Sequence, residues 1–278
     1  MTTVTITRPE HSAVRPTHRP GFSDRTRSEW TKLKTLRSTW WSLGLMIAAG
    51  LGFTITACAV YTANYNTLDP ATQVQFRQDT IGLILQPAAQ FAALAVCVLG
   101  VLLIASEYST GMIKATMLAT PRRTSALLAK GAAFAGLIFT LTLVLAFACF
   151  FIGSAITSSH ASVSITDPTT LRAIGAFALF MTAMGVIALS VGTLVRHTAA
   201  GISIVLAMQF VLPGVLSLIP GSLGKHLSAS LPSGATVMMG SGHNSDDVFT
   251  PLQGLAILAG WTVVLAGAAL LSIKKRDV

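Results

Sequence analysis

The side chains that could take part in chemistry are concentrated in one stretch, residues 106–130, which reads SEYSTGMIKATMLATPRRTSALLAK. The stretch separates two long apolar runs, where a chain that crosses a bilayer usually has only a short turn. Glu107 would stand at the start of a short helix, where a carboxylate is favourable against the helix dipole. Gly111 permits a bend or the close approach of another surface, and Pro121 ends the helix. This pattern predicts a docking segment, residues 106–121, through which a protein outside the membrane could move the neighbouring helices.

Two arginines, Arg122 and Arg123, follow this segment and would lie at the membrane face. Their charge leaves a second interpretation open. Glu107 could simply pair with these arginines, or all three side chains could contact lipid headgroups. We favour the docking interpretation.

Motifs for catalysis or metal binding are absent from the sequence. It has no GxxxxGK[ST] loop for a nucleotide, and no HExxH or CxxC pattern. Cys58, Cys97 and Cys149 each fall in an apolar run, where a thiol behaves as a small hydrophobe. His243 stands near two aspartates in a Gly/Ser-rich loop, a spacing too weak to indicate a metal site. We therefore expect no catalytic residue, cofactor or metal in this chain.

The composition is that of a polytopic membrane protein. Hydrophobic residues make up 52% of the chain, charged residues only 10%, and the mean hydropathy is +0.68, whereas soluble domains are about 25% charged. Six apolar runs each approach the roughly 20 residues that cross a bilayer, which predicts an all-α fold with six transmembrane helices. These runs are Trp40–Tyr61, Ile81–Ala105, Ser125–Thr157, Leu171–Val195, Thr198–Ile219 and Leu252–Ile273.

The positions of the basic residues predict the orientation. With the N-terminus inside, all lysines and arginines except Arg77, Arg172 and Lys225 fall in inner segments or at the inner ends of runs. Cytoplasmic loops carry such an excess. We therefore expect a multi-pass protein of the plasma membrane with both termini and the docking segment in the cytoplasm. The net charge of +9 then reflects orientation, and we expect no nucleic acid as a partner. Lys130 would lie among the cytoplasmic headgroups.

The N-terminal region divides at residue 28. Residues 1–27 are rich in Thr, Pro, Arg and His and cannot bury enough apolar surface to fold, which predicts a disordered basic tail. Residues 28–278 would form a single membrane domain. Between Ser28 and Thr39 apolar residues recur at helical spacing, which predicts a helix lying in the membrane interface. Its stripe consists of Trp30, Leu33, Leu36 and Trp40, and Arg37 would have to snorkel. A plain extension of the first span is the alternative.

Two further features concern helix shape and packing. The segment Leu231–Met239 is apolar but too short to span, and lies between Gly, Ser and Pro residues, which is typical of a re-entrant or interfacial helix. We expect it to form an outer gate through Leu231, Val237, Met238 and Met239. Pro213-Gly214 predicts a kink in the fifth run. Close helix packing is expected at Gly44, Gly50, Gly52, Gly131 and Gly136.

Several of these patterns together resemble the permeases of type-2 ABC exporters, of the single-domain kind common in actinobacteria. The resemblance lies in Glu107-x-x-x-Gly111, in Thr120-Pro121-Arg122-Arg123 before Lys130, in EWTKL from Glu29 and RSTWW from Arg37, and in the KKRD ending. It implies that the segment after the second span is a coupling helix that docks on an ATPase subunit. Many members have Thr after the glycine, where this chain has Met112. The implied coupling residues are Glu107, Tyr108, Ser109, Thr110, Gly111, Met112, Lys114, Pro121, Arg122 and Arg123.

The resemblance implies a permease subunit of an ATP-driven exporter, with no enzymatic activity of its own. ATP and Mg would be bound by a separate ATPase subunit, and a second permease copy or a paralogue would complete the path within the membrane lipids. The interiors of the apolar runs hold essentially no ionisable residue, which disfavours an ion-coupled carrier. The alternative function is a membrane scaffold or sensor that transports nothing. The transported substrate stays open.

The orientation predicts a difference in labelling of two serine positions. Ser109→Cys and Ser241→Cys are introduced into a chain whose three native cysteines have been replaced. A membrane-impermeant thiol reagent added to intact cells should label position 241 and spare position 109, because only the former lies outside. The reverse pattern would contradict the orientation and the docking segment with it.

Overall fold

The computed structural model describes residues 21–35, 37–111, 123–241 and 248–275. Within these ranges the chain forms helices and loops and no strand. Six helical segments are long and apolar enough to cross a membrane, so the predicted all-α, six-span fold class is confirmed. The segments are α2 (Arg37–Ala63), α4 (Thr80–Ser109), α6 (Arg123–Thr157), α7 (Pro168–Val195), the fifth span (Thr198–Ser217) and α11 (Pro251–Lys275).

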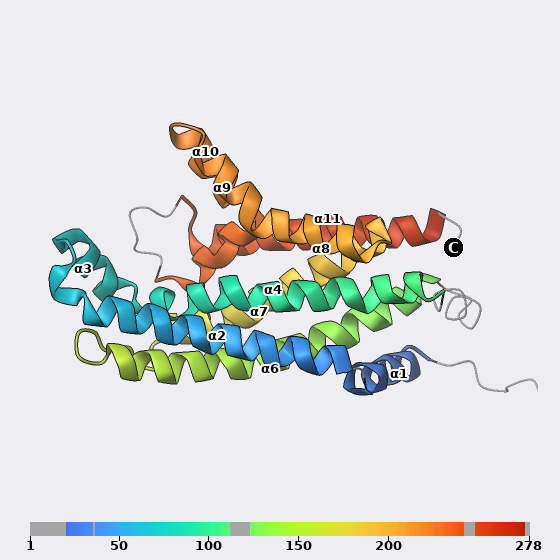
Figure 1. Cartoon of the computed structure of the whole chain (residues 1–278), viewed down its shortest axis with the longest axis horizontal. Coiled ribbons are helices and arrows are strands. Elements are labelled where there is room, and N and C mark those ends of the chain that lie inside the picture. Colours follow the sequence, from blue (N-terminus) through green and yellow to red (C-terminus); the bar gives the residue numbers. More distant parts are fainter. Residues whose placement is uncertain (1–20, 36, 112–122, 242–247, 276–278) are drawn as a thin grey trace, which may run out of the picture.

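The spans run side by side, and the bundle has two distinct ends (Figure 1). The α1 end carries α1 (Phe22–Thr35), the last turn of α4 and the C-terminal end of α11. The opposite α3 end carries the short η1 (Tyr65–Thr67), α3 (Pro70–Gln78) and the loop between α6 and α7. The segment that joins α4 to α6, which includes most of the predicted coupling residues, leaves from the α1 end.

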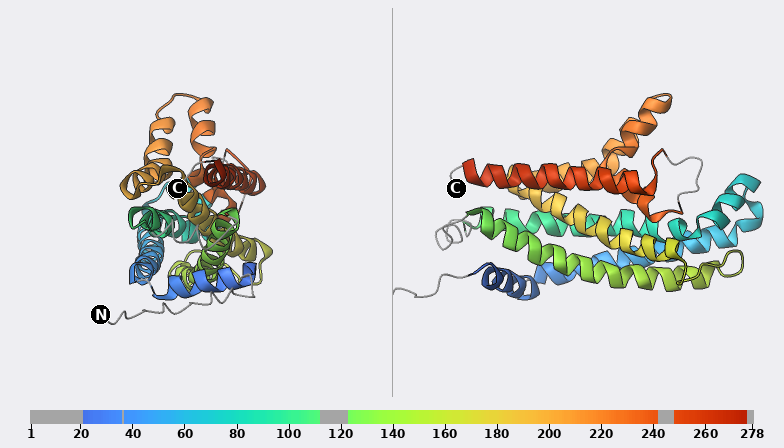
Figure 2. Two further views of the ribbon diagram at one scale, coloured as in Figure 1. Left: turned by 90° about the vertical axis from the view of Figure 1, so that its right-hand side faces the viewer. Right: turned by 180° about the vertical axis from the view of Figure 1, so that it is seen from behind.

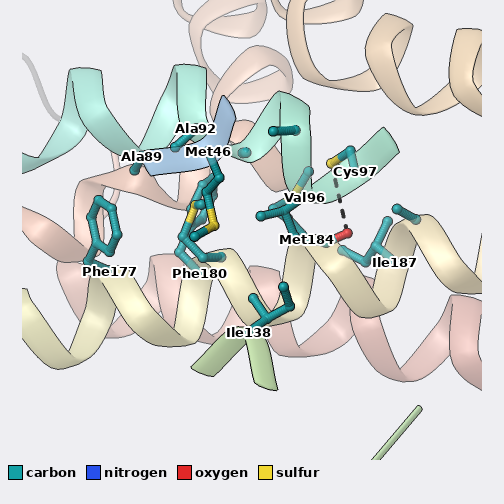
Figure 3. Packing of buried hydrophobic residues seen from close by; sticks show 14 of the residues in the cluster. Met46, Ala89, Ala92, Val96, Cys97, Ile138, Phe177, Phe180, Met184 and Ile187 are labelled. Atoms are coloured by element: carbon teal, nitrogen blue, oxygen red, sulfur yellow. Dashed lines mark hydrogen bonds between the residues drawn. The ribbon is translucent and has the colours of Figure 1, made fainter. Parts of the chain in front are cut away.

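Helices α4 and α7 form the centre of the bundle. In their most apolar windows 72% of the residues are buried, against 33% or less in the other four spans. Figure 3 shows the aromatic rings of Phe177 and Phe180 on α7 beside small α4 residues such as Ala89. Met46 of α2 and Ile138 of α6 close the cluster. The other spans pack around this pair and leave much of their surface open to lipid.

Glycines allow α4 and α7 to approach closely, but not the glycines that the sequence suggested. A Cβ on Gly100 would lie 2.7 Å from the carbonyl oxygen of Gly185. A Cβ on Gly192 would lie 3.2 Å from the backbone of Val101. The prediction holds only at Gly50, which lies against a leucine side chain. No described atom lies within 4 Å of the Cβ position at Gly44, Gly52, Gly131 and Gly136.

The predicted interfacial helix is two helices. Helix α1 ends at Thr35 and α2 begins at Arg37, and Figure 2 shows α1 running across the end of the bundle. A straight extension of the first span is therefore wrong. Helix α1 also begins at Phe22, so residues 22–27 are helical although they were expected in the disordered tail. Residues 1–20 lie outside the described ranges.

The residues of the predicted interfacial stripe separate in space. Leu33 is buried in the protein core, whereas Trp30 is half-buried. Trp40 belongs to the first turn of α2 and is 63% exposed, with its indole Nε1 donating to the carbonyl of Lys34. Arg37 is exposed and opens α2. Leu36 lies outside the described residues. Contact between α1 and lipid therefore stays a prediction.

The chain between the fifth and sixth spans doubles back at the α3 end. Helix α10 (Ser222–Ala229) packs beside α9, and the two lean away from the bundle (Figures 1 and 2). The following 3₁₀ helix η3 (Pro232–Met239) confirms the helical conformation predicted for this stretch. Its apolar side chains are buried by α4, α7 and α11 of the same chain, and its depth in the membrane stays a prediction. The buried set includes Leu231, Val237, Met238 and Met239.

Both ends of η3 are held by hydrogen bonds to other helices. Before η3, the indole Nε1 of Trp261 donates to the carbonyl of Ser230 at 2.9 Å. After it, Arg172 of α7 donates to the carbonyl of Gly240 at 2.5 Å. The backbone N–H of Ser241 donates to the carboxylate of Asp79 at 2.6 Å. A role for η3 as an outer gate stays a prediction.

The close approach of α4 and α7 predicts a position-specific cost of adding one methyl group. Gly100→Ala should lower the free energy of unfolding in detergent by about 1–3 kcal/mol, because the methyl group meets backbone rather than a side chain that can move. Gly136→Ala is the matched control. It adds the same group where the Cβ position is open, and should leave stability unchanged or slightly raised. Equal stability of the two variants, measured by thermal unfolding, would contradict this packing.

Candidate functional site

Glu107 lies in the last turn of α4, whereas the sequence suggested that it begins a helix. Tyr108 and Ser109 complete this helix, and Thr110 caps it. Gly111 follows with a φ of +70°, a left-handed conformation that ends helices and that glycine adopts without strain. The helix dipole therefore does not favour Glu107, because its negative end lies here. Another interaction must stabilise the carboxylate.

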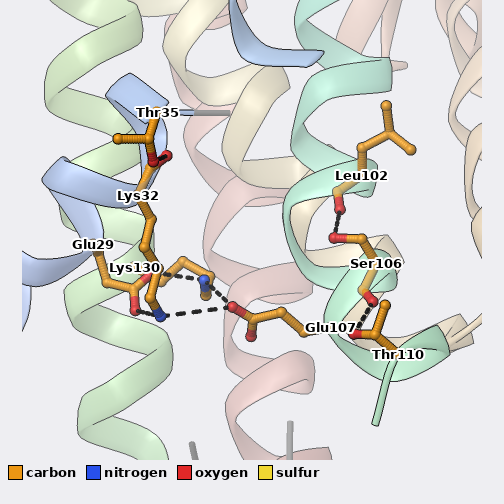
Figure 4. Close-up of polar contacts among 8 residues, drawn as sticks. All are labelled: Glu29, Lys32, Thr35, Leu102, Ser106, Glu107, Thr110 and Lys130. Carbon is orange, nitrogen blue, oxygen red and sulfur yellow. Dashed lines mark hydrogen bonds and ion pairs between the residues drawn. The ribbon is translucent and has the colours of Figure 1, made fainter. Parts of the chain in front are cut away.

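That interaction is a buried cluster of ion pairs, drawn in Figure 4. Lys130 of α6 places its Nζ 2.8 Å from Oε1 of Glu107 and 2.6 Å from Oε2 of Glu29 on α1. Lys32 pairs with the other oxygen of Glu29 at 2.6 Å and approaches Glu107 at 3.9 Å. Two lysines thus neutralise two carboxylates. We name these four residues the ion cluster.

The ion cluster is largely removed from water. The side chain of Lys130 is only 5% exposed, and those of Glu107 and Glu29 are 9% and 11% exposed. Lys130 therefore does not lie among headgroups, as its place in the sequence suggested. A buried charge that loses its partner costs about 3–5 kcal/mol. The side chains of Glu29, Glu107 and Lys130 must therefore stay together, which fixes α1 against α4 and α6.

The Glu29 carboxyl shows how the charges act on one another. Burial raises its pKa, but the positive charges and hydrogen bonds of Lys130 and Lys32 outweigh that effect. The pKa of Glu29 is therefore lowered from its ordinary value of 4.5. The carboxylate is charged at neutral pH and holds both lysines.

A second contact joins the end of α4 to the end of α7. Arg196 caps α7 in a left-handed conformation with a φ of 57°, which is uncommon for a residue with a side chain. Its guanidinium carbon lies 5.2 Å from the centre of the Tyr108 ring, within the range of a cation–π contact. Adjacent residues of α4, Glu107 and Tyr108, thus connect its end to three other elements.

The remaining predicted coupling residues are only partly described. Ser109, Thr110 and Gly111 are exposed at the end of α4, where both hydroxyls donate to the carbonyl of Ser106. Arg123 is the first residue of α6. Met112, Lys114, Pro121 and Arg122 lie outside the described residues, and so does the weak His243 site. A coupling helix in this segment therefore stays a prediction.

Sequence reasoning missed a polar contact in the middle of the membrane spans. The amides of Gln90 on α4 and Gln209 in the fifth span face each other. Gln209 donates to Oε1 of Gln90 at 3.3 Å, and Gln90 donates to the backbone carbonyl of Gln209 at 3.4 Å. Both side chains are uncharged, so they do not stand out as ionisable residues in the apolar runs. A glutamine in such a run is itself a signal, because an amide in a membrane needs a partner.

The backbone explains why Gln209 is the residue contacted. The fifth span consists of α8 (Thr198–Leu206), the π-helical turn η2 (Ala207–Val211) and α9 (Leu212–Ser217). Pro213 has no N–H to donate to the carbonyl four residues earlier, which is that of Gln209. The amide of Gln90 supplies a donor to this carbonyl. The irregularity predicted from Pro213-Gly214 thus begins one turn before the proline.

Comparison with known proteins adds no assignment. No protein-family model matches the chain, and no curated protein matches it either. The site is therefore interpreted from its own geometry and from the sequence patterns described above.

The lowered pKa of Glu29 predicts how stability depends on pH. The carboxylate stabilises the fold fully above its unfolded pKa, and this contribution is lost as the pH falls through the lower folded pKa. The melting temperature in detergent should therefore decrease as the pH falls below about 4.5. In Glu29→Gln the melting temperature should be lower at pH 7, and its decrease in acid should be smaller.

The exposed cap Asp69, whose pKa is also lowered, provides the control. Asp69→Asn should keep the part of the acid transition that belongs to the ion cluster. Identical pH profiles for the wild type and Glu29→Gln would show that the cluster does not stabilise the fold.

Proposed function

We propose that this chain is the permease subunit of an ATP-driven exporter, with the segment between α4 and α6 as its contact to a separate ATPase. The observation that carries the proposal is the ion cluster. It joins α1, α4 and α6 through Glu29, Glu107 and Lys130 at the end of the bundle from which that segment leaves. A force applied to the segment would reach these three elements together.

The central position of α4 supports a mechanical role. A displacement of its end would act on α7, with which α4 packs most extensively, and on α2. Through the Gln90–Gln209 contact it would also act on the fifth span at the π-helical turn. A helix with an irregular turn can change its bend with little cost to the rest of the bundle. The expected motion is a change in the angle between α4 and the fifth span.

The energy for such a motion would come from outside the membrane. The polar contact between the two spans consists of uncharged amides, and ion-coupled carriers usually keep ionisable groups at this depth. ATP and Mg would be bound by the partner ATPase, and this chain would provide none of the hydrolytic residues. A second permease copy or a paralogue would complete the path. The chain would lie in the plasma membrane, with its α1 end facing the cytoplasm.

The proposal predicts that an ATPase copurifies with this chain and that the amount recovered depends on Gly111. The tagged full-length chain is recovered from its native membranes in mild detergent, and bound proteins are identified by mass spectrometry. Gly111→Pro should reduce the recovered ATPase roughly tenfold, because proline cannot adopt a φ of +70° and the chain would leave α4 in another direction.

Gly221→Pro is the matched control. Gly221 also has a positive φ, of +85°, and open space at its Cβ position, but it lies at the α3 end. The Gly221→Pro variant should copurify with the ATPase at the wild-type level. Absence of any ATPase from the wild-type sample, or equal recovery with both variants, would contradict the proposal and favour a scaffold or sensor.

A further inference from the structure

A cavity of about 500 Å³ lies at the α3 end, between α2, α3, α4 and η3. Its volume falls within the range of pockets that hold small organic ligands. The cavity is formed within one copy of the chain and is distant from the ion cluster, which lies at the other end of α4. It therefore has no part in the proposed contact with an ATPase.

One wall of the cavity is polar, although it belongs to a membrane span. Asp79, Gln86 and Gln90 all line it and recur on one face of α4. Within the described residues the amide of Gln86 makes no hydrogen bond to protein, and Gln75 of α3 presents a second such amide. Gln86 is half-buried and Gln75 is exposed, so both amides can donate to or accept from a polar group of a solute in the cavity.

Among the described residues, the cavity lining holds one charged side chain, the acidic Asp79. Asp79 is 6% exposed and is fixed in place, because its Oδ1 accepts from the N–H groups of Gly82 and Ser241. These two backbone contacts contribute to the position of the carboxylate, which places an acidic side chain in the wall of the cavity.

The other walls carry aromatic rings from three elements. Tyr61 of α2 and Phe76 of α3 lie 6.4 Å apart between ring centres. Phe91 of α4 is stacked on Phe53 of α2 with ring centres 3.5 Å apart, which holds the Phe91 ring at the edge of the cavity. The faces of such rings attract cations, most strongly where water is excluded.

We propose that this cavity is a binding site for aromatic organic cations that carry hydrogen-bond donors. The rings of Tyr61, Phe76 and Phe91 would contact the planar body, Asp79 would offset the charge, and the Gln86 amide would accept from an amino or hydroxyl group. The inference goes beyond the proposed function, since binding needs neither ATP nor a partner subunit.

The test uses ethidium, a planar aromatic cation with two amino groups, as the probe. The purified full-length chain in lipid nanodiscs is titrated with it and binding is followed by fluorescence anisotropy, with empty nanodiscs as the background. Saturable binding is expected. Fluorescein, an aromatic anion of comparable size, should not bind saturably, because the described part of the cavity lining holds an acidic side chain and no basic one.

Two variants assign the binding to the cavity. Asp79→Asn removes the charge but keeps an acceptor that caps α4, and Gln86→Leu removes the amide. Each should weaken ethidium binding roughly tenfold, as expected for the loss of one charge-assisted or buried polar contact. The control is Asp167→Asn, which changes the corresponding cap of α7 outside the cavity lining and should bind like the wild type.

The outcomes are distinguishable from those of the exporter test. Absence of saturable binding by the wild type would overturn this inference and leave the ATPase contact intact. Binding that is equal in the wild type, Asp79→Asn and Gln86→Leu would also overturn it. If Asp79→Asn does not fold, as judged by its elution in size-exclusion chromatography, Gln86→Leu decides.

Discussion

The position of Lys130 between two carboxylates constrains the whole α1 end of this protein. Its ammonium group is buried, and such a charge is tolerated only with partners of opposite sign close by. Glu107 reaches it from α4 and Glu29 from α1, more than a hundred positions away in the sequence. Because both partners must be present, α1 cannot continue straight into α2. It lies across the end of the bundle, beside the place where α4 ends and α6 begins.

Helix α4 connects this constraint to the rest of the molecule. Its middle packs closely on α7 through Gly100, and its amide Gln90 contacts the fifth span at the carbonyl four residues before Pro213. Its first residue follows Asp79, which holds the chain after η3. The same helix thus meets the proposed ATPase contact at one end and the proposed ligand cavity at the other. Helix α4 thus physically connects the two proposed sites.

The fold was predictable from the sequence, because a span needs only length and apolar composition. The six runs and the irregularity near Pro213 follow from local chemistry in this way. The ion cluster was not predictable in this way. Glu107 was expected to begin a helix or to pair with nearby arginines, Lys130 was expected among the headgroups, and nothing local pairs Lys130 with Glu29. The tight glycines were misassigned for a similar reason: Gly136 and Gly100 look alike in sequence, and only the neighbouring helix distinguishes them. The Gln90–Gln209 contact was missed because amides carry no charge.

The central claim is that Lys130 and Glu29 act as one unit that fixes α1 to the bundle, and a double-mutant cycle tests it most directly. Free energies of unfolding in detergent are measured for Lys130→Met, Glu29→Gln and the double variant. Each single change should cost up to about 3–5 kcal/mol, because it removes one charge from the cluster and leaves the buried charges that remain unbalanced. The double variant should cost less than the sum of both by about 1–3 kcal/mol. Strictly additive losses, like those expected when Lys130→Met is combined with the distant Asp69→Asn, would contradict the account.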